Sequence, residues 1–408
     1  SEYAVRIPSL LFNTFTIIPI YYLGKVIANK QVGIISALFF IFSSMALFMA
    51  HEARVYSLLT FLTTSSICLF VLLIKQPRKT SYLILLTMVN GLLLYSHYLS
   101  YWVIIVQLLI FITFKNTRSK LSWRYLIHLM ILGVLFIPLI SVVYDRFINS
   151  GVNGTWISTV NGIEDLYNML WNYSNKPLTT VLFILILFAG IIFKISSIKS
   201  TTVKDDRFKW YIHLFLWIPL IISFVLSFKV GFFLDRYFYF LMPLFHLAVV
   251  IAIQQFNTSI RFILSIFTVA LMIFTFSTHS TNNRMSGSHH NTSRVVTEIK
   301  KLQKADRSIV YISPGYYDKE IMYYYNQAVF STYLSDHLNY SVYKSPLNSL
   351  GIYPINDSIE VNVTDTTQQI ILVNRGMSKH NIPSFLNRHY QWKEEFWVDN
   401  VLFSVYKK

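Results

Sequence analysis

Long apolar runs separated by short polar connections fill the first 280 residues of the chain. A helix that crosses a hydrocarbon core about 30 Å thick needs about 20 mostly apolar residues. The pattern predicts ten such helices, at residues 8–28, 31–50, 55–74, 80–97, 99–114, 123–144, 179–194, 210–228, 237–254 and 261–279. The chain is therefore expected to be a polytopic α-helical membrane protein.

A soluble pattern replaces the apolar runs after residue 280, which predicts two domains, 1–280 and 281–408. The stretches TSRVVTEIKKLQ, YYDKEIMYYYNQ and IPSFLNRH are typical of helices, whereas SIVYISP, QIILVN and NVLFSVYKK are typical of strands. About 120 residues are enough for a hydrophobic core. We expect the tail to be a small α/β domain.

Composition supports the membrane assignment. The chain is 54% hydrophobic and 13% charged, whereas soluble domains are about 25% charged. A soluble globular protein is therefore excluded. The single cysteine, Cys68, lies inside an apolar run, so neither a disulfide framework nor a cysteine-based metal site is available.

The net charge of +16 is distributed by membrane side. One set of connections between the predicted spans carries fifteen Lys and Arg residues, the opposite set carries six, and the tail carries fourteen. Cytoplasmic loops are enriched in Lys and Arg, so the first set is predicted to be cytoplasmic and the tail extracytoplasmic. The basic balance thus reflects membrane topology, and we do not expect nucleic acid as a partner.

A long connection, residues 145–178, lies on the predicted outer side. Its Trp156, Glu164, Asp165 and Trp171 suit an amphipathic helix on the bilayer surface. The two acidic residues are also candidates for a catalytic role.

Ionisable residues gather at the predicted outer ends of the spans. The first cluster, AHEARVYSLL, contains His51, Glu52, Arg54 and Tyr56. Ionisable groups at the membrane mark functional sites by default, although an ordinary interfacial loop with a snorkelling Arg is the competing interpretation. If the third span begins before Glu52, then Glu52 and Tyr56 share one helix face.

Two further clusters lie at the same side. YSHYLSYW places His97 and Tyr98 at the end of the fourth span. LDRYFYFLMP places Asp235, Arg236 and Tyr237 at the start of the ninth. The alternatives are an interfacial histidine satisfied by its surroundings and a structural Asp–Arg ion pair.

These three motifs, in this order, resemble those of the C-type glycosyltransferases, the membrane family that contains dolichyl-phosphate-mannose-protein mannosyltransferases and bacterial aminoarabinose and galacturonic acid transferases. HEARVYSLL is similar to the family's Glu-Ala-Arg-x-Tyr turn, SHYLSYW to its His-Tyr helix end, and DRYFYFLMPLF to its Arg-Tyr helix start. The family carries its catalytic acidic residue in a loop after its first helix. The general base is therefore expected upstream of Ser1, in a segment that precedes this sequence.

The resemblance implies transfer of a sugar from a polyprenyl-phosphate donor to a hydroxyl of a glycan, lipid or protein acceptor, with inversion. Arg236 and then Arg54 are expected to hold the donor phosphate, because a guanidinium binds phosphate oxygens in bidentate fashion. Tyr56, Tyr98 and Tyr237 are expected to position donor or lipid. His97 is expected to bind phosphate or metal, and Glu52 to orient Arg54 or a metal. A divalent cation is a candidate cofactor that some family members use.

A transporter or lipid-linked sugar flippase is the alternative, since many spans and a basic inner face fit it too. Transporter sites lie near the bilayer midplane, at interrupted helices and between internal repeats. Here the charged clusters lie at the outer boundary, but Pro138, Pro219 and Pro243 interrupt spans. The expected setting is a bacterial inner membrane, with membrane lipids around the spans and the C-terminal domain outside.

Overall fold

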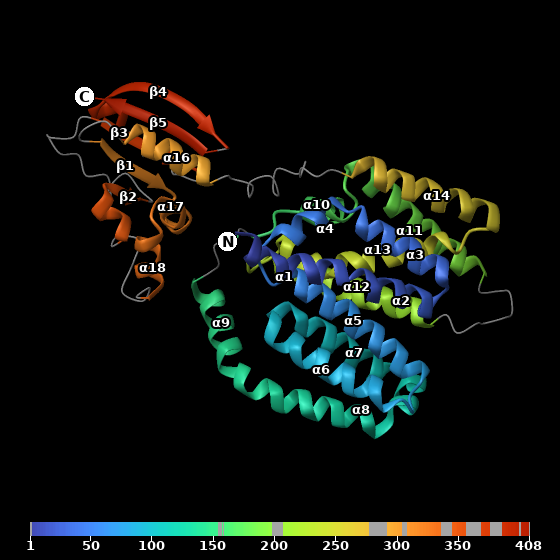
Figure 1. Ribbon diagram of the computed structural model, residues 1–408. Coiled ribbons are helices and arrows are strands. Elements are labelled where there is room, and N and C mark those ends of the chain that lie inside the picture. Colours follow the sequence, from blue (N-terminus) through green and yellow to red (C-terminus); the bar gives the residue numbers. More distant parts are fainter. Residues whose placement is uncertain are drawn as a thin grey trace. The chain divides into compact units, whose positions relative to one another are not determined.

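The computed structural model describes residues 2–153, 157, 159–197, 207–276, 292–303, 308–335, 345–355, 369–375, 386–399 and 401–407. The chain divides into two compact units, Ser1–Thr281 and Asn282–Lys408. The first unit is helical and the second contains a sheet (Figure 1).

The first unit is a bundle of helices joined by short turns. Its elements are α1 (Glu2–Phe15), α2 (Ile17–Ile27), α3 (Lys30–Ile41), α4 (Ser44–His51), α5 (Tyr56–Lys75), α6 (Thr80–Ser96), η1 (Tyr98–Ser100), α7 (Tyr101–Thr113), α8 (Lys115–Phe136), η2 (Ile137–Leu139), α9 (Ile140–Asn153), α10 (Ile163–Tyr173), α11 (Pro177–Ser197), α12 (Arg207–Leu226), η3 (Asp235–Leu241), α13 (Met242–Ile253) and α14 (Thr258–Thr275). The η elements are short 3-10 helices.

The prediction of a polytopic helical membrane protein is confirmed. Within the described residues, six helical segments are long and apolar enough to cross a membrane, or eight if each of two bent pairs is one span. The bent pairs are α3 with α4, at 60°, and α10 with α11, at 97°. The two remaining predicted spans correspond to α6 and α7, which are apolar but shorter. The expected span 31–50 is thus broken, because α3 ends at Ile41 with Phe42 as its C-cap, and Ser43 caps a new helix, α4, by accepting from the Ala46 N–H.

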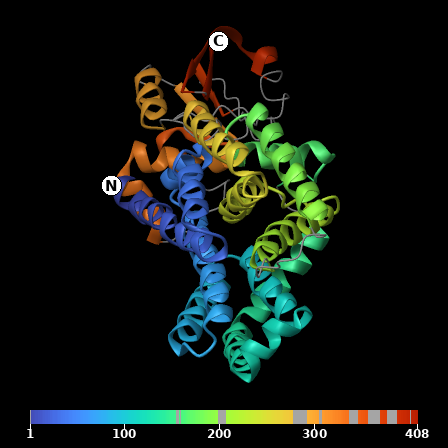
Figure 2. The same cartoon turned by 90° about the vertical axis from the view of Figure 1, so that its right-hand side faces the viewer.

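Helix α13 lies at the centre of this unit. Every residue of α13 is buried, and it packs against α3 on one side and α11 on the other. Figure 2 shows the yellow α13 between blue N-terminal and green helices. Helices α2 and α3 pack still more closely, since a Cβ added at Gly24 would lie 2.7 Å from the Gly33 Cα. Only glycine allows the two backbones to approach this far.

Buried amide and hydroxyl groups tie α5, α6, α7 and α8 together. Ser66 Oγ donates to Asn90 Oδ1 at 2.5 Å, and Asn90 Nδ2 donates to Gln107 Oε1 at 2.8 Å. Gln107 Nε2 closes the ring by donating to Ser66 Oγ at 2.7 Å. His128 joins through Asn90 at 3.3 Å and through Thr87 at 2.8 Å. Polar groups at this depth need protein partners because lipid supplies none.

The second unit is built on a five-stranded sheet of order β2-β1-β3-β5-β4. The strands are β1 (Ser308–Ser313), β2 (Ile352–Pro354), β3 (Gln369–Asn374), β4 (Gln391–Val398) and β5 (Val401–Lys407). β1 pairs in parallel with β2 and β3, and β5 pairs antiparallel with β3 and β4. The helices are α16 (Thr292–Leu302), α17 (Asp318–Tyr325) and α18 (Gln327–Ser335), with 3-10 turns η4 (Gly315–Tyr317) and η6 (Pro346–Leu350).

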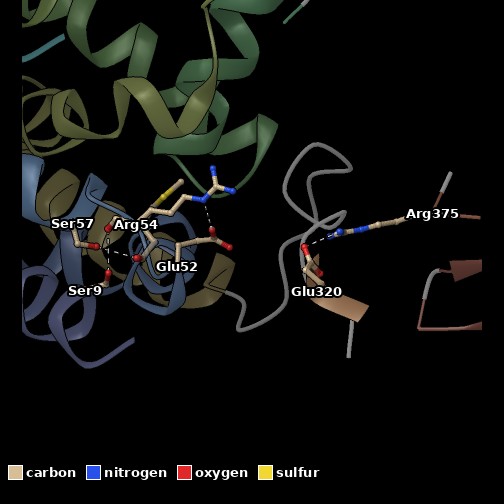
Figure 3. Close-up of polar contacts among 7 residues, drawn as sticks. Ser9, Glu52, Arg54, Ser57, Glu320 and Arg375 are labelled. Atoms are coloured by element: carbon tan, nitrogen blue, oxygen red, sulfur yellow. Dashed lines mark hydrogen bonds and ion pairs between the residues drawn. The ribbon is translucent and has the colours of Figure 1, made fainter. Parts of the chain in front are cut away.

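The small α/β prediction is confirmed, including strands β1, β3 and β5 and helices α16 and α17. Apolar side chains fill a core on each face of the sheet. At the carboxyl end of the parallel strands, Arg375 Nη1 donates to Glu320 Oε1 at 2.9 Å (Figure 3). The Arg375 guanidinium also lies 4.6 Å from the centre of the Tyr317 ring.

Candidate functional site

Four aromatic rings from three distant chain segments meet at one end of the helical unit. We call Tyr56, His97, Tyr98 and Tyr237 the aromatic cluster. The Tyr56 ring centre lies 6.0 Å from that of His97 and 5.9 Å from that of Tyr237. His97 stacks on Tyr98 at 4.3 Å and lies 5.5 Å from Tyr237. Residues of the three motifs singled out in the sequence therefore meet in one cluster.

The residues of the cluster begin helices. Tyr56 is the first residue of α5, Tyr98 opens η1 ahead of α7, and Tyr237 lies in η3 ahead of α13. Helix N-termini present unpaired N–H groups and the positive end of the helix dipole. At η1 the Leu99 N–H already donates to His97 Nδ1, and in η3 the Tyr237 N–H donates to the Leu234 carbonyl. The N-terminus of α5, which packs against η3, is therefore the helix end that favours an anion here.

Two arginines add full positive charge to the cluster. The Arg236 guanidinium lies 5.9 Å from the centre of the Tyr237 ring, and Arg236 is half-buried. The Arg236 and Arg54 guanidinium groups both lie within electrostatic range of Tyr56. Arg54 is the more open of the two, since 52% of its side chain is exposed.

A tight turn holds Arg54 between α4 and α5 (Figure 3). The Arg54 N–H donates to the Glu52 carbonyl at 2.8 Å, and its Nε lies 3.7 Å from Glu52 Oε2. Ser9 on α1 donates to the Arg54 carbonyl at 3.2 Å. Ser57 donates to the Met49 carbonyl at 2.9 Å, which links the start of α5 to α4. The turn is therefore fixed from three helices.

Glu52 is placed beside Arg54 but not on α5. It is the residue that ends α4, with extended backbone, and α5 begins only at Tyr56. The third span therefore does not begin early enough for Glu52 and Tyr56 to share one helix face. The carboxylate instead faces the guanidinium of Arg54 across the turn.

The other predicted residues lie at the margin of the site. His51 Nδ1 hydrogen-bonds with the Leu47 carbonyl of its own helix at 2.8 Å, and its side chain is exposed. Asp235 is the first residue of η3 and is half-buried. His97 Nδ1 accepts from the Leu99 N–H at 3.2 Å, which caps η1. In the long connection, α10 carries Glu164 and Asp165 in its first turn, whereas Trp156 lies outside the described residues.

Several supporting residues were not identified from the sequence. Ser9 and Ser57 hold the Arg54 turn, Asn13 accepts a hydrogen bond from Tyr239, and the Tyr173 hydroxyl donates to the Phe238 carbonyl at 2.6 Å. Ser57 lies within the first motif, AHEARVYSLL, and that position was the available signal. Ser9 and Asn13 are uncharged residues in an apolar run, and only the packing of α1 shows their role.

Metal ligands do not gather in the part of the chain that the structure describes. No group of three or more His, Cys, Asp or Glu residues there could hold a metal ion. Glu52 instead faces Arg54, and His97 is stacked on Tyr98. These residues therefore do not fit the divalent cation considered from the sequence.

Comparison with protein families supports the resemblance drawn from the motifs. The sequence model of a family described as dolichyl-phosphate-mannose-protein mannosyltransferase matches residues 1–143. This match includes the first two motifs. No curated protein matches the chain.

Solved structures share the whole fold. ArnT from Cupriavidus metallidurans in the apo state is 12% identical, with a TM-score of 0.55 over 98% of this chain and 83% of ArnT. ArnT bound to undecaprenyl phosphate is 11% identical, with a TM-score of 0.54 over 99% of this chain and 84% of ArnT. The Archaeoglobus fulgidus oligosaccharyltransferase in the apo form is 9% identical, with a TM-score of 0.51 over 96% of this chain and 62% of the oligosaccharyltransferase. A second structure of that protein is a complex with zinc and sulfate. The chain has the fold of the C-type membrane glycosyltransferases.

Proposed function

We propose that this protein transfers a sugar from a polyprenyl-phosphate donor to an acceptor hydroxyl, with inversion at the anomeric carbon. The observation that carries the proposal is the convergence of two arginines, four aromatic rings and the N-terminus of α5 at one end of an apolar bundle. ArnT, which has this fold, has been crystallised with undecaprenyl phosphate. The acceptor is a glycan, lipid or protein.

Arg236 and Arg54 hold the phosphate of the donor in this proposal. As the glycosidic bond to the phosphate breaks, negative charge grows on the leaving phosphate oxygens. A guanidinium fixed beforehand stabilises that charge without reorganising. Glu52 positions Arg54, and the rings of Tyr56, Tyr98 and Tyr237 flank the sugar and the first isoprene unit. No step is assigned to a metal ion.

The two units have separate roles in the proposal. Residues 1–280 form the glycosyltransferase-like membrane domain, and residues 281–408 form an extracytoplasmic domain. The setting is a bacterial inner membrane, with the aromatic cluster and the C-terminal domain on the outer side. The distribution of basic residues along the sequence supports this orientation.

The test uses the full protein in proteoliposomes with Arg236→Ala. Sugar transfer is measured from labelled polyprenyl-phosphate pentoses and hexoses to delipidated cell-envelope acceptors. Movement of a fluorescent polyprenyl phosphate between leaflets is measured in parallel. We expect transfer to fall about 10²- to 10³-fold, the usual loss when one electrostatic stabiliser is removed.

The matched control is Lys229→Ala, which removes an exposed basic residue from the connection that precedes η3 and should leave transfer unchanged. Wild-type protein that moves the lipid but transfers none of these sugars would support the transporter or flippase instead. Equal loss in both variants would show that the effect is one of general surface charge, and it would remove Arg236 from the site.

A further inference from the structure

The element that carries Arg236 is a long 3-10 helix. η3 runs over 7 residues, Asp235–Leu241. Runs of 3-10 helix longer than about three or four residues are uncommon, because their hydrogen bonds have poorer geometry than those of an α-helix. Such a segment needs contacts from outside to keep one conformation. The position of the Arg236 guanidinium therefore depends on what holds η3.

Tyr173, the last residue of α10, holds η3 from the outer connection. Its hydroxyl donates to the Phe238 carbonyl at 2.6 Å, and Phe238 lies two positions after Arg236 in η3. Both Tyr173 and Phe238 are fully buried, so this hydrogen bond forms in a low-dielectric interior, where it is stronger than in water. The Asp235 carboxylate lies within electrostatic range of the same hydroxyl. Tyr173 thus lies beside the start of η3 and is bonded to its middle.

Helix α13 fixes Tyr173 in turn. His246 Nε2 donates to the Tyr173 carbonyl at 2.8 Å, and the Tyr173 ring centre lies 5.7 Å from that of Phe245. Since α13 is buried along its whole length, these contacts fasten Tyr173 to the centre of the bundle. A phenol anchored in this way restricts the carbonyl group that it binds.

The turn that follows Tyr173 is anchored to two more helices. Asn175 Nδ2 donates to the Phe42 carbonyl at 2.8 Å, and Asn175 Oδ1 accepts from the Ser44 N–H at 2.8 Å. Phe42 and Ser44 lie on either side of the break between α3 and α4. Asn175 has a φ of 67°, a left-handed conformation that asparagine adopts more readily than most residues. The turn between α10 and α11 is therefore bonded to α3, α4 and α13.

We propose that Tyr173 is a positioning residue that sets Arg236 in place through η3. This inference rests on the proposed function, in which the Arg236 guanidinium holds the donor phosphate. The imidazole of α13 fixes Tyr173, and Tyr173 fixes the Phe238 carbonyl of the helix that carries Arg236. A guanidinium placed in advance stabilises the charge that grows on the leaving phosphate without reorganising. Because Tyr173 is fully buried, it acts through Arg236 and not by contact with the donor.

The test is Tyr173→Phe in the full protein, which removes only the hydroxyl that binds η3. We expect kcat for sugar transfer to fall about 2- to 10-fold, the effect of one hydrogen bond between neutral groups. The donor KM should change less, because the charge that Arg236 stabilises grows as the glycosidic bond breaks. Amide hydrogen exchange, followed by mass spectrometry, should become faster in Asp235–Leu241.

The matched control is Tyr211→Phe. Tyr211 is also fully buried, and its hydroxyl shares a hydrogen bond with Thr117 Oγ1 at 2.7 Å. It lies near the start of α12, whereas η3 follows the end of that helix in the chain. The control therefore loses a hydroxyl of the same kind elsewhere in the bundle. Neither kcat nor exchange in η3 should change.

A double-mutant cycle with Arg236→Ala separates positioning from a general loss of stability. If Tyr173 acts through Arg236, adding Tyr173→Phe to Arg236→Ala should lower sugar transfer no further. A further fall as large as that in the wild-type background would overturn the proposal. So would unchanged exchange in η3 in Tyr173→Phe, or an equal loss of kcat in Tyr211→Phe. Wild-type protein that transfers no sugar, with faster η3 exchange in Tyr173→Phe alone, would reject the proposed function and still support the role of Tyr173 in positioning η3.

Discussion

Replacing Asn90 with leucine tests whether the buried polar ring holds four helices together. The Asn90 side chain makes three hydrogen bonds, to Ser66, Gln107 and His128, at 2.5, 2.8 and 3.3 Å. All four side chains are almost fully buried. Leucine fills a similar volume but bonds to none of them. The change therefore isolates the polar contribution.

The expected loss follows from the number of bonds. Hydrogen bonds between membrane helices contribute about 0.6 kcal/mol each and at most about 1.7. Three of them give a loss of about 2 kcal/mol for Asn90→Leu, with an upper limit of about 5. We expect the free-energy loss for Asn90→Leu to exceed the sum for three isolated hydrogen bonds. The reason is that Ser66 and Gln107 each lose one of their two partners in the ring, and bonds in a closed network strengthen one another.

Unfolding of the purified protein in mixed detergent and SDS micelles, followed by circular dichroism, measures this free energy. Met88→Leu is the control, because Met88 lies on the same helix with 61% of its surface exposed and should change stability little. In a double-mutant cycle, Asn90→Leu and Gln107→Leu should be strongly non-additive. If Asn90→Leu unfolds at the wild-type SDS fraction, the ring does not stabilise the bundle and the reasoning is refuted.

Two further changes test close packing and burial. Gly24→Val should cost about 1–3 kcal/mol, because its Cβ would meet the Gly33 backbone at 2.7 Å. Gly133→Ala, with no atom within 4 Å, should cause no loss of stability in the same SDS assay, because alanine also favours the helix more than glycine does. In the second unit, burial raises the pKa of Asp318, and its Oδ1 has no hydrogen-bond partner among the described residues. A raised folded-state pKa means that stability is lost as pH rises from about 4, the unfolded value, through the folded value. Asp318→Asn should therefore slow amide exchange in β1 more at pH 7 than at pH 4; equal effects would contradict this.

The spans could be predicted because a membrane sets the length of an apolar helix. What the pattern did not reveal were the bends. Because Ser43 is uncharged and small, the pattern predicts residues 31–50 as one apolar helix. In the structure its hydroxyl instead caps a new helix. Strand β4 was missed for a related reason. It is one of the two edge strands of the sheet, where charged residues such as Glu394 and Glu395 are tolerated and interrupt the apolar pattern.

The residues of the site could be named from the sequence, but not their assembly. Arg54, His97 and Arg236 stood out as polar groups at span ends. These residues come together because α5 packs against η3. That packing cannot be predicted from any one motif. The supporting hydroxyl of Ser9 is 45 residues from the carbonyl that it contacts. Such residues become visible only when the helices are placed in space.

In the helical unit, uncharged polar groups lie at the centre of the helices and charged groups lie at their ends. This distribution favours an enzyme over a transporter. At the centre of α5 to α8 the polar side chains are uncharged amides and hydroxyls with one histidine, and Asn90 joins Ser66, Gln107 and His128 into one hydrogen-bonded group. The arginines of the candidate site lie instead in a turn and a 3-10 helix at span ends. A transporter needs its substrate groups near the midplane, where Asn90, Gln107 and His128 already use their hydrogen bonds within the bundle. The transferase that we propose needs positive charge where the lipid phosphate meets water, and Arg54 and Arg236 at the helix ends are the proposed source of that charge.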